Sequence, residues 1–244
     1  MRIDLRAAVT ISSWSPAMRR AWPPPWPTGL RGETGVTVDL VPADLTDAQD
    51  LARIERRLRV VGGIGVLVNN AGTTIRSGFL NQGSEDLSRL LALNVTAVTR
   101  LANAAASRFV KAGEGAIINL ASVVGLAPEF GSTVYGATKA FVLFLSQGLS
   151  LELASKGVYV QAVLPAAVRT QIWEYAGKDV NAVPGVMEVN ELVDAALVGF
   201  DRRELITIPP LHDATQWSAF EVARRAMLPN FAQAVPAERY RSAA

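Results

Sequence analysis

The chain has 244 residues, half of them apolar and 19% charged, which is the composition of a folded protein with room for a real core. Its 24 basic and 22 acidic side chains nearly balance, so charge gives no reason to expect a nucleic-acid or membrane partner. Because it has no cysteine and a single histidine, His212, disulfides, thiolate chemistry and multi-histidine metal sites are excluded. There is no membrane-spanning apolar run and no secretory apolar segment, so we expect a cytoplasmic protein.

Residues 1–35 differ in composition from the rest of the chain. They hold three of the five tryptophans and five of the thirteen prolines. The run at 21–27 favours polyproline II over a helix or a central strand, because its prolines lack a backbone N–H donor. Within this segment, only residues 7–13 are expected to form a short strand.

From Gly35 onward, strands alternate with helices. Strands are predicted at 36–41, 64–68, 115–122, 158–164 and 205–208, and helices at 47–60, 84–113, 134–156, 191–200 and 213–227. Such alternation indicates an α/β fold, with a mostly parallel sheet, right-handed crossovers and helices on both faces. We expect one domain over residues 36–244, preceded by the atypical N-terminal segment 1–35.

Polar or otherwise unusual residues follow four of these strands. Asp44 comes after the first, Asn-Asn-Ala-Gly at 69–72 after the second, Ser122 at the end of the third, and residues 165–170 after the fourth. Ligands of open α/β sheets bind outside the carboxyl ends of the strands, so these residues are candidates for one site. A turn or helix-capping role for Asp44 is an equally good interpretation.

Tyr135 and Lys139 are four residues apart in the helix predicted at 134–156, and this spacing puts both side chains on one helical face. A free tyrosine titrates near pH 10. Because a nearby ammonium favours the phenolate, we expect Lys139 to lower the pKa of Tyr135. Tyr135 would then exchange a proton with a substrate oxygen to which Ser122 donates a hydrogen bond. The alternative, a merely solvated pair, is disfavoured by the positions of Ser122 and Asn94.

Together these motifs resemble the short-chain dehydrogenase/reductase family over roughly residues 36–210. The matching segments are Asn-Asn-Ala-Gly at 69–72, Leu93-Asn94-Val95, Ser122 thirteen residues before Tyr135, Tyr135-Gly136-Ala137-Thr138-Lys139, and Pro165 to Thr170 with Ala166 in place of the usual glycine. Each motif is weak alone, but five in the right order and spacing are specific.

The resemblance implies a Rossmann-like, doubly wound fold and hydride transfer between NADP or NAD and a small-molecule alcohol or carbonyl. It implies that Tyr135 is the general acid/base and that Lys139 holds the nicotinamide ribose and tunes Tyr135. Ser122 would orient the substrate, and Asn94 would anchor a water in a proton relay. A homodimer or homotetramer is also implied.

The resemblance also implies a set of cofactor-binding positions. They are Asp44 and Leu45 beside the adenine, Asn70, Ala71 and Gly72 along the adenosine ribose, Tyr135 and Lys139 at the nicotinamide ribose, and Pro165, Val168 and Thr170 at the nicotinamide end. The residue that selects NADP over NAD usually follows the family's second strand and is not readable here. We favour NADP.

One motif of the family is missing. Its Thr-Gly-x-x-x-Gly-x-Gly turn lets the backbone approach the diphosphate, but this chain has no glycine before Gly29. We therefore hypothesise that residues 1–30 are a frameshifted or rearranged remnant. A second function stays open: an impaired relative that binds dinucleotide poorly and acts as a binding protein, or a damaged gene product. A serine hydrolase is disfavoured, because no Gly-x-Ser-x-Gly surrounds Ser122.

The loop at 169–190 is expected to set substrate identity. It is rich in apolar side chains, which suggests an apolar or mixed substrate rather than a polyanion. Trp173 and Tyr175 either line a substrate pocket or cover the core. His212 follows two prolines and is interpreted as a loop residue.

Overall fold

The computed structural model describes residues 8–11, 39–75, 78–170, 172–177 and 179–241. The chain divides into two compact units, one that ends at Pro209 and one that begins at Pro210. All five strands and all the predicted catalytic residues belong to the first unit. The domain boundaries expected from the sequence, 1–35 and 36–244, stay predictions.

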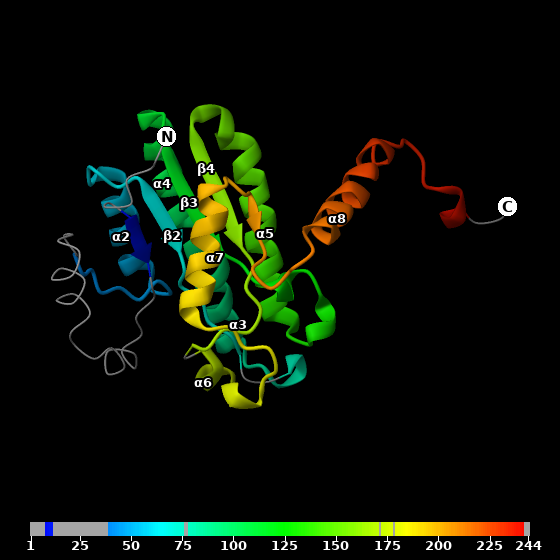
Figure 1. Cartoon of the computed structure of the whole chain (residues 1–244), viewed down its shortest axis with the longest axis horizontal. Helices are drawn as coiled ribbons and strands as arrows, with labels where there is room; N and C mark the ends of the chain where they lie inside the picture. The colour runs from blue at the N-terminus through cyan, green and yellow to red at the C-terminus, as the bar shows by residue number, and fades with distance from the viewer. Residues whose placement is uncertain (1–7, 12–38, 76–77, 171, 178, 242–244) are drawn as a thin grey trace. The chain divides into compact units, whose positions relative to one another are not determined.

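The first unit is built on a parallel five-stranded sheet, which confirms the predicted fold class (Figure 1). Its strands lie side by side in chain order, as β1 (Ala8–Ile11), β2 (Val66–Asn69), β3 (Gly115–Leu120), β4 (Val158–Val163) and β5 (Ile206–Thr207). In register, Val68 faces Ile118, and Ile118 faces Gln161. The predicted strand at 7–13 is therefore real as β1, and it pairs with β2.

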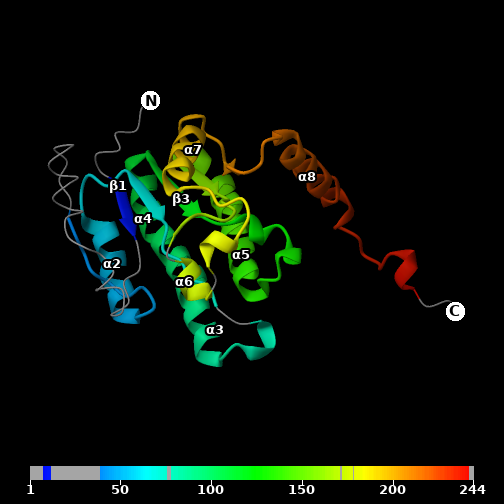
Figure 2. The ribbon, with the colours of Figure 1, turned by 60° about the horizontal axis from the view of Figure 1, so that its bottom comes forward.

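Helices cover both faces of this sheet, as expected of a Rossmann-like, doubly wound fold (Figure 2). The helices of the first unit are α2 (Ala48–Val60), α3 (Ser84–Leu91), α4 (Val98–Ala112), α5 (Thr133–Leu153), α6 (Ile172–Ala176) and α7 (Val189–Asp201). Short 3-10 turns lie at η3 (Phe79–Asn81), η5 (Val123–Gly125), η6 (Pro128–Phe130), η7 (Ala154–Lys156) and η8 (Val180–Ala182). The 169–190 region thus holds a short helix, α6, that was not predicted from the sequence.

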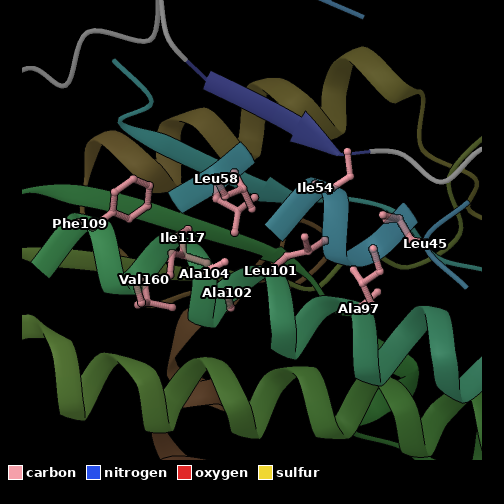
Figure 3. Packing of buried hydrophobic residues seen from close by; sticks show 14 of the residues in the cluster. Leu45, Ile54, Leu58, Ala97, Leu101, Ala102, Ala104, Phe109, Ile117 and Val160 are labelled. Atoms are coloured by element: carbon pink, nitrogen blue, oxygen red, sulfur yellow. The ribbon is translucent and has the colours of Figure 1, made fainter. Parts of the chain in front are cut away.

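The main core fills one face of the sheet (Figure 3). Ile54 and Leu58 from α2 meet Leu101 from α4, and Ile117 of β3 lies beneath them. A second cluster on the other face joins Phe200 of α7 to strand residues. Because successive side chains of a strand point to opposite faces of the sheet, the apolar residues of β2 to β4 contribute side chains to both clusters.

The helix boundaries follow from local sequence. Either Thr46 or Asp47 was expected to cap α2, and Asp47 is the cap, because its carboxylate accepts hydrogen bonds from the backbone N–H groups of the first turn. Gly113 ends α4 with a φ of 72°, a left-handed conformation that favours glycine. Gly157 follows α5 and η7 with a φ of 80°, and a Cβ there would come within 1.9 Å of the Gly113 carbonyl oxygen.

One predicted strand is wrong where the structure describes it. Residues 39–41 belong to no strand, and 36–38 lie outside the described residues. Leu40 is exposed, so the apolar alternation read at this point does not correspond to a buried sheet face. By contrast, the predicted helix at 84–113 is continuous but carries an unpredicted π-helical segment, η4 (Ala92–Ala97), between α3 and α4.

A chain of buried amides crosses the sheet. The Asn69 Nδ2 donates to Asn119 Oδ1 at 2.9 Å, and Asn119 Nδ2 donates to Ser146 Oγ at 2.9 Å. Ser146 then donates to the Val142 carbonyl within α5. All three polar side chains are buried, so these hydrogen bonds tie β2 and β3 to α5 where water does not compete.

The second unit contains α8 (Ala214–Ala226), followed by the turns η9 (Leu228–Asn230) and η10 (Glu238–Tyr240). Asp213 begins the helix by accepting from the Thr215 N–H, close to the predicted start. His212 is exposed in the bend before it, as interpreted from the sequence. Among the helices of the described chain, none combines the length and apolar character that crossing a membrane requires.

Candidate active site

Ser122 is held between the ends of two neighbouring strands. It follows β3 and begins η5, where its hydroxyl oxygen accepts from the Val124 N–H at 3.3 Å. The hydroxyl donates to the carbonyl oxygen of Pro165, just beyond β4, at 3.1 Å. Ser122 is buried, so its direction is fixed by backbone groups rather than by solvent.

Two glycines let the Ser122 turn lie directly against α5. A Cβ on Gly125 would come within 2.6 Å of the Ala140 backbone nitrogen. A Cβ on Gly136 would come within 3.1 Å of the Val124 carbonyl oxygen. This close approach brings Ser122 within hydrogen-bonding reach of Tyr135, the residue before Gly136.

Lys139 is buried one helical turn beyond Tyr135 on the same face of α5. Its Nζ lies 5.7 Å from the centroid of the Tyr135 ring. The ammonium donates to the carbonyl oxygen of Leu120, the last residue of β3, at 2.8 Å. The phenol, the serine hydroxyl and the lysine predicted from the sequence therefore converge at the carboxyl end of β3.

The pKa values in this site differ from those expected. Burial raises the pKa of Tyr135 to about 12, and the hydrogen bond with Ser122 opposes that rise. Burial also lowers the pKa of Lys139 to about 8. In the protein alone the pKa of Tyr135 is therefore raised rather than lowered, because burial of the phenol is the largest cause.

Asn94 joins the site from the other side. It lies in the π-helical segment η4, a kind of irregularity often found at functional sites. Its Oδ1 accepts from the Thr73 N–H at 3.0 Å, and its Nδ2 donates to the Thr73 carbonyl at 2.9 Å and to Thr138 Oγ1 at 3.1 Å. Asn94 is 1% exposed, so its amide is fully committed to these partners.

The segment after β2 leaves space beside Lys139. A Cβ on Gly72 would come 3.5 Å from Lys139 Nζ and 3.6 Å from Asn94 Oδ1. Among the described residues Lys139 Nζ has one acceptor, the Leu120 carbonyl, so the ammonium keeps further donors for ligand hydroxyls. These residues fit the ribose end of a dinucleotide. Asn70 is exposed and Ala71 half-buried in the same segment.

Asp44 and Leu45 have local roles in the structure. The Asp44 carboxylate accepts from the Thr46 N–H at 2.9 Å and from its hydroxyl at 2.7 Å, and it pairs with Arg89 at 3.4 Å. This is the turn role considered from the sequence. Leu45 is 1% exposed within the main core (Figure 3). With Asn69 and Ala71 it lines a narrow crevice that has no room for a water molecule.

The loop after β4 is pinned by backbone contacts. Val168 is buried and forms a β-bridge with Met187, whereas Thr170 is exposed. The Trp173 indole N–H donates to the Val168 carbonyl at 2.7 Å. Trp173 thus anchors this loop through a contact that sequence reasoning did not identify. The side chain of Tyr175 lies outside the described part of the structure.

Sequence reasoning also missed two residues that organise the site. The role of Gly125 depends on contact with a helix distant in sequence, which no local pattern reveals. Thr138 was visible only as a hydroxyl inside the Tyr-Gly-Ala-Thr-Lys motif. Its partner Asn94 is 44 positions away.

Comparisons with known proteins agree with this geometry. The family model for short chain dehydrogenases matches residues 27–181. Over 138 residues the chain is 35% identical to the 2,5-dichloro-2,5-cyclohexadiene-1,4-diol dehydrogenase LinX of Sphingobium indicum, covering 56% of this chain and 55% of that protein. The chain therefore spans little more than half the length of such curated relatives.

Solved structures match over more of their length. A short-chain dehydrogenase from Sphingobium yanoikuyae in complex with NADPH is 56% identical, with a TM-score of 0.90, over 96% of this chain and 90% of that one. A bulky-bulky ketone specific alcohol dehydrogenase from Comamonas testosteroni is 51% identical, with a TM-score of 0.84, over 96% and 88%.

Proposed function

Since this chain belongs to the short-chain dehydrogenase family of oxidoreductases, we propose that it interconverts a small-molecule alcohol and a carbonyl with NADP(H). The observation that carries the proposal is the convergence of Tyr135, Ser122 and Lys139 at the carboxyl end of β3. The comparisons do not favour the alternative of an impaired relative.

The chain's own residues handle the substrate oxygen. When bound, the dinucleotide supplies or accepts the hydride. In the direction of reduction, the Tyr135 hydroxyl donates its proton to the substrate oxygen as negative charge develops there. Ser122 turns its single hydroxyl hydrogen from the Pro165 carbonyl to the same oxygen, which stabilises that charge and orients the carbonyl. In oxidation the Tyr135 phenolate takes the alcohol proton, while Ser122 keeps its hydrogen bond to the substrate oxygen.

Lys139 and Gly72 hold the cofactor in this proposal. The buried ammonium binds ribose hydroxyls with the donors that Leu120 leaves free, and Gly72 provides the space beside it. A bound ligand that supplies acceptors around Nζ favours the charged lysine, which in turn favours the phenolate of Tyr135. NADP is preferred to NAD here, supported by the NADPH in the 56% identical relative.

For the substrate we propose a ketone with two bulky substituents. The specificity of the 51% identical Comamonas enzyme for bulky-bulky ketones supports this class. The apolar side chains of the 169–190 loop agree with it, and Trp173 anchors that loop at Val168. A homodimer or homotetramer also remains a proposal, for which the exposed apolar Phe144 and Leu151 on α5 are suitable contacts.

The test combines cofactor binding with turnover. NADPH should raise the unfolding temperature of both the native protein and Tyr135→Phe, because Lys139 and the other cofactor-binding positions remain in that variant. Turnover of a diaryl ketone should fall at least about a hundredfold in Tyr135→Phe, since general acid–base catalysis is worth roughly 10²–10⁴. Failure to bind either NADPH or NADH at millimolar concentration, or undiminished turnover in the variant, would refute the proposal.

A further inference from the structure

Thr138 lies inside the catalytic motif, between Tyr135 and Lys139, yet its side chain faces the protein interior. It is 2% exposed. Its hydroxyl donates to the Tyr135 carbonyl oxygen at 2.7 Å and accepts from Asn94 Nδ2 at 3.1 Å. The Thr138 hydroxyl thus donates its single hydrogen to the backbone of Tyr135. Its oxygen accepts a hydrogen bond from the side-chain amide of Asn94.

The same Asn94 amide also binds the backbone of the segment after β2. Its two other hydrogen bonds both go to the backbone of Thr73, one to the N–H and one to the carbonyl. Thr73 directly follows Gly72, beside which the Lys139 ammonium lies. A continuous path of four hydrogen bonds therefore runs from the segment proposed to face the cofactor, through Asn94, to the first turn of α5.

We infer that Thr138 is a positioning residue that sets α5 against the Thr73 segment and so fixes where the phenol of Tyr135 stands relative to the cofactor. Its kinetic consequence rests on the proposed function. Thr138 acts through Tyr135 and Asn94 and takes no part in proton transfer itself. The residue that makes this contact belongs to the Tyr-Gly-Ala-Thr-Lys motif itself, because Thr138 is one residue from Lys139 and three from Tyr135.

An ordinary helical threonine offers a comparison within the same molecule. The Thr99 hydroxyl donates to the Val95 carbonyl at 2.8 Å in α4, which is the common bond of a threonine to its own helix. Thr138 makes a similar bond but adds the buried bond from Asn94. Removing the Thr138 hydroxyl leaves a donor of Asn94 without a partner in a buried site, whereas removing that of Thr99 does not.

The test compares Thr138→Val, Thr138→Ala and Thr138→Ser with the matched control Thr99→Val. Valine keeps the shape of threonine without the hydroxyl, alanine avoids any new clash, and serine restores both hydrogen bonds. Steady-state kinetics with NADPH and a diaryl ketone gives kcat and KM. Hydrogen exchange at the Thr73 amide, measured without cofactor, reports directly whether Asn94 still holds that segment.

We expect Thr138→Val and Thr138→Ala to lower kcat by about tenfold to a hundredfold, the size of effect that a small misplacement of a catalytic group produces. KM for the ketone should change little, and the Thr73 amide should exchange faster. Thr138→Ser and Thr99→Val should match the native protein in all three measurements.

Two results would overturn the inference. One is native kcat and native Thr73 exchange in both Thr138→Val and Thr138→Ala. The other is a loss in Thr138→Ser as large as in Thr138→Val, which would point to packing rather than to the hydroxyl. If the native protein shows no turnover with any cofactor, the proposed function fails, and the exchange comparison alone then decides whether Thr138 positions the segment.

Discussion

Burial of Lys139 makes the stability of the cofactor-free protein depend on pH in a direction that can be worked out. Its pKa is lowered from 10.5 to about 8, because the ammonium has lost its water. Below pH 8 both the folded and the unfolded chain bind this proton, and the folded chain bears the full cost of burying the charge. Between pH 8 and about 10.5 only the unfolded lysine keeps its proton, so the free energy of unfolding rises with pH.

The size of the effect follows from the pKa difference. A shift of one unit corresponds to about 1.36 kcal/mol, so the full shift is worth about 3 kcal/mol. Tyr135 acts with the opposite sign, but only at higher pH, because its folded pKa is raised from 10.0 to about 12. The folded tyrosine keeps a proton that the unfolded one has lost, which lowers stability above pH 10. The range from pH 8 to pH 10 therefore isolates Lys139.

The assay is urea unfolding of the native protein and of Lys139→Met at pH 7, 8, 9 and 10. Methionine has a similar length and carries no charge, so other titrating groups cancel in the difference between the two proteins. The native protein should gain stability relative to Lys139→Met as pH rises above 8, by about 2 to 3 kcal/mol at pH 10. A difference that stays flat or falls with pH would show that the lysine is not buried as described.

Three further substitutions test the surrounding geometry. Ser122→Ala should lower kcat by about 10²–10³, as loss of one oxyanion donor does, and single-turnover kinetics measures it. Gly125→Ala should cost about 1–3 kcal/mol in chemical unfolding, because its Cβ would overlap the α5 backbone. Gly148→Ala, inside α5 with nothing within 4 Å of the added Cβ, is the control and should not destabilise, because alanine favours a helix over glycine. Asn119→Ala should destabilise by about 2 kcal/mol or more, because the buried Asn69 Nδ2 loses its acceptor and the buried Ser146 Oγ loses a donor, and an unchanged urea midpoint would contradict this.

The parts of the fold that could be predicted are those with local signals. Asp47 at the start of α2 and Gly113 and Gly157 after helices are residues whose own chemistry specifies the boundary. The apolar runs of β2 to β4 are similarly self-evident, because strands covered on both faces need no polar alternation. The strand expected at 36–41 was supported only by alternating apolar and polar residues. Leu40, which that strand would have buried, is exposed.

The electrostatics of the site were harder to predict, because burial is a tertiary property. From the sequence, Tyr135 and Lys139 are simply a phenol and an ammonium one turn apart. In the fold both side chains are buried away from water. Burial raises the pKa of Tyr135 and lowers the pKa of Lys139. The helical spacing correctly predicted that the two side chains meet, but not the direction in which the pKa of Tyr135 moves.

Backbone carbonyl groups orient the polar side chains of this site. Sequence motifs therefore identify the side chains, but they do not identify the carbonyl groups that orient them. Lys139 donates to the Leu120 carbonyl, Ser122 to that of Pro165, and Asn94 to that of Thr73. Each carbonyl lies at or just beyond the end of a central strand, β3, β4 or β2. Since every residue type carries the same carbonyl, the side chains at 73, 120 and 165 leave no trace of this role in the sequence. The parallel sheet supplies the acceptors, and it follows that the site depends on the register of three strand ends as directly as on its four conspicuous side chains.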